Sequence, residues 1–161
     1  MTDARPGFIP LPVLAHPSVA STPGAEHDAA ANPHFVRLGG EPTIARLVER
    51  FYHHMSTLPE ARIIRAMHPS DLEETKRVLT RYLVQWTGGP AHYSAERGHP
   101  RLRRRHLPFS IGDAERDAWL ACMHAALDET VDDATLREQL YARLREVADF
   151  MRNRSDVENG R

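Results

Sequence analysis

Apolar residues recur at spacings of three and four along four stretches of the chain, which is the pattern of helices with one buried face. The first stretch comprises Ile44, Leu47, Val48, Phe51, Tyr52 and Met55, and the second comprises Leu72, Leu79, Tyr82, Leu83 and Trp86, with Thr75 on the same face. The third comprises Trp119, Met123, Ala126 and Leu127, and the fourth comprises Leu136, Leu140, Leu144, Val147 and Met151. No stretch alternates between apolar and polar residues, as a half-buried strand would. These positions predict an all-α fold in which the longer helices share one core.

Short motifs between these stretches predict where the helices begin and end. Residues 70–73, Ser-Asp-Leu-Glu, have the spacing of a capping box and predict the start of the second long helix. Gly and Pro at residues 88–90 end that helix. Residues 60–67 are expected to form one or two further turns and residues 101–106 a short helix, whereas residues 90–100 are expected to be irregular.

The length of 161 residues fits a single domain with extensions. Residues 1–33 hold six of the twelve prolines and few charges, so we interpret them as a flexible Pro/Ala-rich N-terminal extension. An alternative is an arm that docks on the domain or on a second subunit through Phe8, Ile9 and Leu11. The domain itself is expected over residues 34–154, followed by a polar tail at 155–161.

Charge and cysteine content exclude several classes of protein. The formal net charge is −1, so no overall field favours binding to nucleic acid or to an anionic membrane. The single cysteine, Cys122, allows neither an intramolecular disulfide nor a multi-cysteine metal site, and it fits a cytoplasmic protein. No apolar run is long enough to span a membrane, and the prolines near the N-terminus do not fit a signal peptide.

Candidate chemistry is carried by a series of motifs whose order and spacing resemble the group II truncated haemoglobins over residues 35–153. The motifs are Leu38-Gly39-Gly40, Phe51-Tyr52, Trp86-Thr87-Gly88-Gly89-Pro90, Tyr93, Gly98-His99-Pro100-Arg101-Leu102, His106-Leu107-Pro108-Phe109 and Trp119. The resemblance implies a truncated globin, a two-over-two helical sandwich that encloses a b-type haem with its iron.

By this resemblance His106 is the proximal ligand of the haem iron. Neutral imidazole suits that role because it binds haem iron and leaves the opposite axial position open. Taken alone, a histidine close to a proline is more often structural, and it is the motif around His106 that favours the ligand.

The resemblance also implies a distal side that stabilises a bound ligand. Tyr52 and Trp119 match the distal tyrosine and tryptophan, and His68 lies where a third donor is expected. Phenol and indole hydrogens can donate to dioxygen, which gains negative charge when it binds ferrous haem. The alternatives are a core tyrosine paired with Phe51, a tryptophan that only fills the core, and a surface histidine in a turn before Pro69.

Further residues are expected to contact the haem itself. Thr75 is small and leaves an open route for ligands, while Leu79 and Leu83 line the apolar face of the ring. In the family that the chain resembles, a basic residue often precedes the leucine that matches Leu79, but this chain has Val78 there. Arg105 from the basic cluster at 101–105 is therefore expected to hold a propionate, with Lys76 and Arg77 as alternatives. The remaining expected contacts are Trp86 and Tyr93 at the propionate edge, and Phe109.

These residues indicate reversible binding of dioxygen and other small diatomic ligands. Several distal donors slow ligand release, which favours oxygen or redox chemistry over bulk oxygen transport. The alternative is a haem enzyme, a nitric oxide dioxygenase or a peroxidase, that depends on an external reductant and an unidentified reductase. A monomer and a homodimer are both compatible with the sequence.

Overall fold

The computed structural model describes residues 34–155, and every regular element in that range is a helix. The elements are α1 (His34–Leu38), α2 (Glu41–Thr57), η2 (Pro59–Ala61), α3 (Arg62–Ala66), α4 (Glu73–Trp86), α5 (His92–Arg97), α6 (Leu102–His106), α7 (Asp113–Thr130) and α8 (Ala134–Phe150). The prediction of an all-α fold is confirmed. The predicted N-terminal extension, residues 1–33, and all but the first residue of the predicted tail lie outside the described residues.

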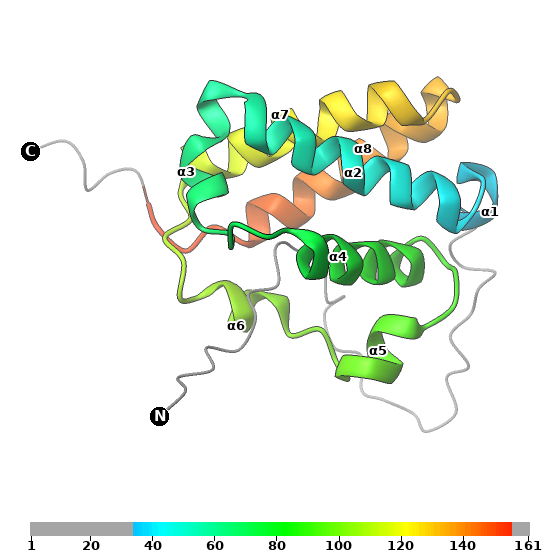
Figure 1. Cartoon of the computed structure of the whole chain (residues 1–161), viewed down its shortest axis with the longest axis horizontal. Helices are drawn as coiled ribbons and strands as arrows, with labels where there is room; N and C mark the ends of the chain where they lie inside the picture. The colour runs from blue at the N-terminus through cyan, green and yellow to red at the C-terminus, as the bar shows by residue number, and fades with distance from the viewer. Residues whose placement is uncertain (1–33, 156–161) are drawn as a thin grey trace, which may run out of the picture.

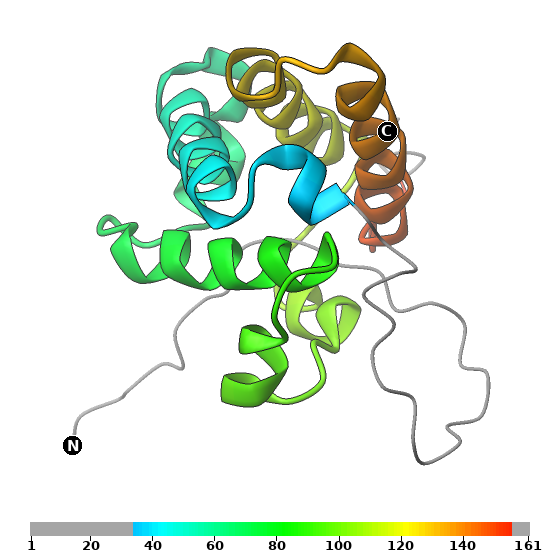
Figure 2. The same cartoon turned by 90° about the vertical axis from the view of Figure 1, so that its right-hand side faces the viewer.

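The four long helices form two pairs that lie against each other. Helix α2 packs on α4 and on α7, and α7 packs on α8. In both views α5 and α6 lie on the far side of α4 from α7 and α8 (Figures 1 and 2). The long helices thus form the upper layers, and the short helix that carries His106 lies below them.

The apolar stripe of α2 is entirely buried, as its spacing predicts. All six of its apolar positions are buried in the shared core, namely Ile44, Leu47, Val48, Phe51, Tyr52 and Met55. Full burial of one large apolar side chain stabilises a fold by roughly 1.5–3 kcal/mol, so this face is a main reason that α2 forms where it does. Pro42 lies in the first turn of α2, where its missing N–H costs no hydrogen bond.

The core also encloses Cys122 on α7. Its side chain is completely buried, and burial raises the pKa of the thiol to about 12. The thiol is therefore protonated at neutral pH and behaves as a small apolar side chain.

The capping box expected at residues 70–73 does not form. Helix α4 begins at Glu73 without a capping side chain on the residue before it, and the Asp71 carboxylate accepts a hydrogen bond from the Glu73 N–H at 3.0 Å. A capping interaction occurs instead at α7, where the Glu115 carboxylate accepts from the Gly112 N–H at 2.8 Å. A matching spacing of side chains does not fix the cap when the loop before the helix takes another conformation.

The segment expected to be irregular contains helix α5. Gln85, near the end of α4, accepts a hydrogen bond from the Ser94 N–H at 2.9 Å and donates to the Ser94 hydroxyl at 2.7 Å. These bonds connect α5 to α4 across nine residues of sequence. A six-residue helix has little stability of its own, so this contact with α4 explains a helix that local sequence signals do not predict.

Helix α1 is fixed to the turn that follows α4. The Phe35 N–H donates to the Thr87 carbonyl oxygen at 2.9 Å, and the Phe35 ring lies over Gly89. A Cβ atom at Gly89 would lie 2.8 Å from the Phe35 ring and 2.9 Å from Val84 Cγ1, which is closer than van der Waals contact allows. Glycine at 89 therefore permits the close approach of α1.

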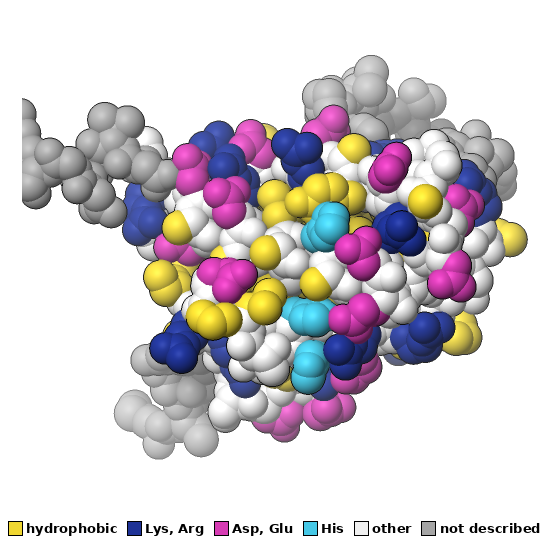
Figure 3. Space-filling model, turned by 90° about the horizontal axis from the view of Figure 1, so that it is seen from above, with side chains coloured by type: hydrophobic (Ala, Val, Ile, Leu, Met, Phe, Trp, Pro, Cys, Tyr) yellow, Lys and Arg dark blue, Asp and Glu magenta, His cyan; other side chains and the backbone are white. Residues whose placement is uncertain are grey.

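The upper face of the molecule carries mixed charges. Basic and acidic side chains alternate there with histidines and small apolar areas over the part that the structure describes (Figure 3). Helices α2 and α7 are joined on the surface by Glu129, which accepts hydrogen bonds from Arg50 and pairs with His54 Nε2 at 2.6 Å. Within residues 34–155 no helix is long and apolar enough to cross a membrane.

Candidate functional site

A pocket lies among residues of α3, α6, α7 and α8, and it contains about 420 Å³ of space not filled by atoms, its open mouth included. Most of its wall is apolar. Four residues that the sequence predicts for the site contribute to the wall together, namely His68, His106, Phe109 and Trp119. The structure therefore brings residues from three separate parts of the chain to one cavity.

His106 is the last residue of α6 and is buried. Its Nδ1 lies 2.6 Å from the carbonyl oxygen of Leu102, one turn earlier in the same helix. Because a carbonyl oxygen can only accept, Nδ1 carries the hydrogen, and the neutral ring has its lone pair on Nε2. Burial lowers the pKa of His106, which favours this neutral form. The ring has the tautomer that a metal ligand bound through Nε2 requires.

Two hydrogen-bond donors are buried close to this pocket. The Tyr52 hydroxyl on α2 and the Trp119 indole N–H on α7 have no hydrogen-bond partner among the described residues. A buried donor without a partner costs about 1–3 kcal/mol, so two of them close together point to a ligand that accepts from them. Burial raises the pKa of Tyr52 well above its usual value, and the phenol remains a donor at any physiological pH.

The two donors belong to one row of aromatic rings. The Trp119 and Phe51 ring centroids are 5.3 Å apart, those of Phe51 and Tyr52 4.9 Å, and those of Tyr52 and His68 5.7 Å, all with edge-to-face geometry. The Phe51 ring therefore packs against both rings that carry the donors. The alternative interpretation of Tyr52 as a core residue paired with Phe51 describes its ring correctly, but it leaves the hydroxyl unexplained.

His68 lies in the turn after α3 and is buried, which rules out a surface histidine. Its Nδ1 lies 2.6 Å from the Ile64 carbonyl oxygen, so Nδ1 carries the hydrogen and Nε2 of the neutral ring is an acceptor. Burial lowers the pKa of His68 to about 4, and the ring is neutral at pH 7. His68 lines the pocket as expected, but this tautomer does not fit the expected role of a third donor.

The predicted residues of α4 and α5 are not among those that line the pocket. Thr75, Leu79 and Leu83 are buried on α4. Tyr93 on α5 packs edge-to-face against Tyr82 with 5.3 Å between ring centroids, and its buried hydroxyl has no hydrogen-bond partner among the described residues.

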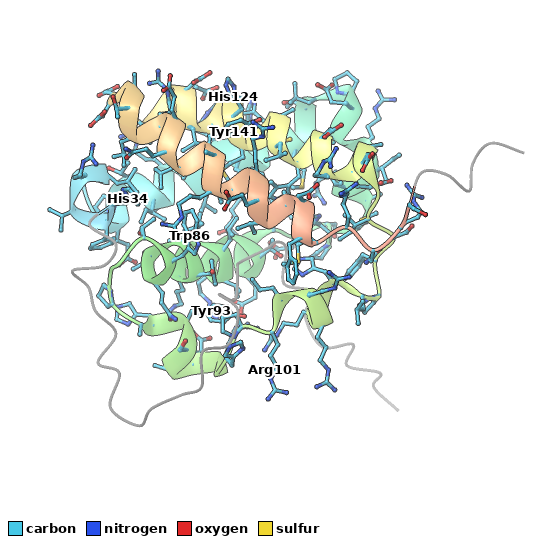
Figure 4. The ribbon with its side chains drawn as sticks, turned by 180° about the vertical axis from the view of Figure 1, so that it is seen from behind. His34, Trp86, Tyr93, Arg101, His124 and Tyr141 are labelled. Carbon is cyan, nitrogen blue, oxygen red and sulfur yellow. The ribbon has the colours of Figure 1, made fainter. Side chains whose placement is uncertain are left out.

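Two arginines influence the Tyr93 hydroxyl. Burial raises the pKa of Tyr93, and the nearby guanidinium groups of Arg105 and Arg97 partly offset that effect. Arg97 already pairs with Glu74 at 3.2 Å, so the Tyr93 hydroxyl and the Arg105 guanidinium are the donors on the α5–α6 side that suit a carboxylate. Figure 4 shows Tyr93 on α5 and Arg101 before α6 on this side.

Trp86 is not part of the pocket. It is half-buried at the end of α4, and the guanidinium carbon of Arg143 on α8 lies 5.7 Å from its ring centroid (Figure 4). Its contacts connect α4 to α8.

Glu115, which the sequence interpretation did not single out, does line the pocket, and its buried carboxylate pairs with Arg154 at 2.9 Å. Glu115 lies three residues after Gly112, which is the spacing of a capping box, so its capping role could have been predicted from the sequence.

Comparison with known proteins identifies the family of the chain. Residues 34–153 match the family model described as bacterial-like globin. The group 2 truncated hemoglobin YjbI of Bacillus subtilis (strain 168) is 41% identical over 120 residues, which cover 74% of this chain and 89% of that protein.

Solved structures of similar proteins share the fold. The cold-adapted truncated hemoglobin of the Antarctic marine bacterium Pseudoalteromonas haloplanktis TAC125 has a TM-score of 0.74 and 39% identity, over 75% of this chain and 98% of that one. The group II 2-on-2 hemoglobin of Agrobacterium tumefaciens has a TM-score of 0.73 and 44% identity, over 76% of this chain and 95% of that one. The chain belongs to the bacterial-like globin family and, within it, to the group II truncated haemoglobins, which are haem-binding globins with a two-over-two fold.

The side chains of this chain fit a haem. Nε2 of His106 carries the lone pair that an iron ligand needs, and the buried donors of Tyr52 and Trp119 need an acceptor. The Tyr93 hydroxyl and the Arg105 guanidinium suit a propionate at the opposite edge. The buried hydroxyls of Tyr52 and Tyr93 and the indole N–H of Trp119 would each gain a partner from the cofactor or its ligand.

Proposed function

We propose that this protein binds a b-type haem through His106 and reversibly binds dioxygen and other small diatomic ligands, with oxygen or redox chemistry as its role rather than bulk transport. The observation that carries the proposal is the combination, in one pocket, of a histidine fixed in the Nε2 lone-pair tautomer and a buried tryptophan donor without a partner among the described residues.

Haem supplies an iron with an axial position at which a diatomic ligand binds. His106 would ligate the iron, and Leu79 and Leu83 of α4 and Phe109 after α6 would contact the ring. Tyr93 and Arg105 pair with the propionates, since a phenol and a guanidinium both donate to carboxylates.

Tyr52 and Trp119 act on the ligand. A hydrogen bond to a charged acceptor contributes about 1.5–3 kcal/mol, which corresponds to roughly a ten- to hundredfold change in a dissociation constant. The Trp119 indole can only donate, so it favours a ligand with negative charge. His68, as an acceptor at neutral pH, contributes its ring to the wall and its contact with the Tyr52 ring.

A second candidate is a haem enzyme, either a nitric oxide dioxygenase or a peroxidase, supplied with electrons by an external reductase. The feature that favours it is the presence of two donors near one pocket, which retain a ligand long enough for a second small molecule to react. Ligand kinetics measured with and without a reductase or peroxide separate the two candidates, because only the enzyme turns over when a co-reactant is supplied.

The central test is the variant His106→Ala. We expect loss of the proximal-histidine absorption spectrum in the reduced protein and in its carbon monoxide complex, weaker haem retention, and recovery of the spectrum when imidazole is added. His124→Ala is the matched control, because His124 lies on the surface of α7 beside Tyr141 and its loss leaves the pocket intact. An unchanged proximal-histidine spectrum in His106→Ala would reject the proposal.

A further inference from the structure

The backbone that follows His106 is bound to a segment from the other end of the domain. Asn153, three residues beyond the end of α8, donates from Nδ2 to the Phe109 carbonyl at 2.7 Å and to the His106 carbonyl at 3.2 Å. Its Oδ1 accepts from the Ile111 N–H at 2.9 Å. The main-chain N–H groups of Asn153 and Arg154 both donate to the Ile111 carbonyl, at 2.9 and 3.1 Å.

We propose that Asn153 is a positioning residue for the proximal histidine. It holds the loop of residues 107–111, which directly follows His106. Through that loop it fixes the orientation of the imidazole relative to the haem. This inference rests on the proposed ligation of iron by His106.

Helix α6 needs such an external support. It has five residues, too few to be stable alone, and it starts after Arg101, whose φ of 44° is a left-handed conformation that costs a non-glycine residue about 1–2 kcal/mol. The imidazole is bonded to Leu102 within the same short helix, so this bond fixes the ring to α6 but does not fix α6 to the domain. The bonds from Asn153 connect the end of α6 to α8.

An asparagine amide matches the three backbone groups that it contacts. Its NH2 group has two hydrogens for the carbonyls of His106 and Phe109, and its oxygen accepts from Ile111. Aspartate keeps the acceptor but has no hydrogens to donate, and it would place a negative charge beside two carbonyl oxygens. Leucine has a similar size and makes none of these bonds.

The neighbouring arginine offers a control in the same segment. Arg152 pairs with Asp113 at 2.6 Å and with Asp149 at 3.0 Å. The pair with Asp113 connects the end of α8 to the start of α7, the pair with Asp149 stays within the end of α8, and neither involves the loop after His106. Loss of Arg152 therefore weakens the attachment of the segment without removing the contacts that define the proposal.

The experiment uses the full-length protein with haem bound and compares Asn153→Leu, Asn153→Asp and Arg152→Ala with the wild type. The measurements are the iron–histidine stretching band of the ferrous protein by resonance Raman, the rate of haem transfer to excess apomyoglobin, and the melting temperature. We expect Asn153→Leu to shift the band and to accelerate haem transfer about tenfold, the lower end of effects seen when outer-shell partners of metal ligands are removed. Asn153→Asp should shift the band as well, while Arg152→Ala should leave it at the wild-type frequency.

The outcomes distinguish the possible failures. A lower melting temperature in the Asn153 variants with an unchanged stretching band would mean a purely structural role and would overturn the inference. Should Asn153→Leu fail to fold, Asn153→Asp, which keeps the Ile111 bond, decides by the same criterion. Absence of an iron–histidine band in the wild type would reject the proposed ligation itself, and this inference with it.

Discussion

At the scale of single residues, the chemistry depends on which atoms carry a hydrogen. His106 and His68 both have Nδ1 bonded to a carbonyl oxygen one turn earlier, so both have their lone pair on Nε2. Tyr52 and Trp119 contribute hydrogens. The Tyr52 phenol keeps its proton at neutral pH because its pKa is raised, and the Trp119 indole nitrogen can act only as a donor. The pocket region thus contains lone pairs suited to a metal and donors suited to a ligand.

The two donors should control how long dioxygen stays bound. We expect Tyr52→Phe and Trp119→Phe each to accelerate dioxygen dissociation by roughly ten- to hundredfold, since each removes one hydrogen bond to a charged acceptor. Stopped-flow measurement of release checks this, and the double variant should be non-additive if both donors contact one ligand. Tyr93→Phe is the control, because it removes a buried hydroxyl on the propionate side and should affect haem retention instead. Wild-type release rates in both single variants would contradict this assignment.

Sequence motifs predict some site residues and not others for a clear reason. His106, Tyr52 and Trp119 stand in short motifs whose residue types and spacing are characteristic, so the sequence identifies them. The tautomer of His68 depends on the Ile64 carbonyl, whose position relative to the ring is known only once the turn after α3 is formed. Asn153 lies 47 residues from His106, and its role comes entirely from the tertiary structure.

At the scale of helices, apolar spacing was sufficient for the long elements. The predicted apolar residues of α2, α7 and α8 are buried, because a continuous core requires them. In α4 the middle of the predicted stripe is buried, whereas its two ends, Leu72 and Trp86, are only half-buried. The short elements are a different case. Helix α5 depends on the side chain of Gln85, and the start of α4 depends on Asp71 rather than on the expected cap. The turns expected at 60–67 and the short helix expected at 101–106 do form, as η2, α3 and α6, whereas the contact that stabilises α5 lies outside it and is not encoded in apolar periodicity.

The contact between α1 and the turn after α4 gives a prediction at this scale. Gly89→Ala should lower the free energy of unfolding by about 1–3 kcal/mol, the usual cost of overpacking, because the new methyl group lies 2.8 Å from the Phe35 ring. Urea unfolding of the haem-bound protein measures the effect.

A double-mutant cycle with Phe35→Leu tests the cause of that loss. The smaller side chain makes room for the methyl group, so Gly89→Ala should cost less in the Phe35→Leu background than in the wild type. Equal costs in the two backgrounds would show that the methyl group does not meet Phe35.

At the scale of the whole molecule, haem and fold depend on each other. The candidate haem contacts come from α2, α4, α5, α6, α7 and the loop after His106, so a bound haem would connect five helices of the domain. A ligand that binds only the folded state stabilises it in proportion to the logarithm of ligand concentration over its dissociation constant. Removal of haem should therefore lower the melting temperature of the entire domain and not that of one helix alone.

The single cysteine makes the opening of this core measurable as a chemical rate. Cys122 is the one thiol of the sequence, is completely buried on α7, and has a pKa of about 12, so a thiol reagent reaches it only when the helices around α7 separate. Labelling under native conditions should be at least about a thousandfold slower than in the denatured chain, given ordinary domain stabilities, and slower still after haem is added. Mass spectrometry of the labelled protein over time gives both rates. Labelling as fast as in the denatured chain would place Cys122 outside the core. With slow labelling, the rate measures how often the globin opens, and no engineered probe is needed.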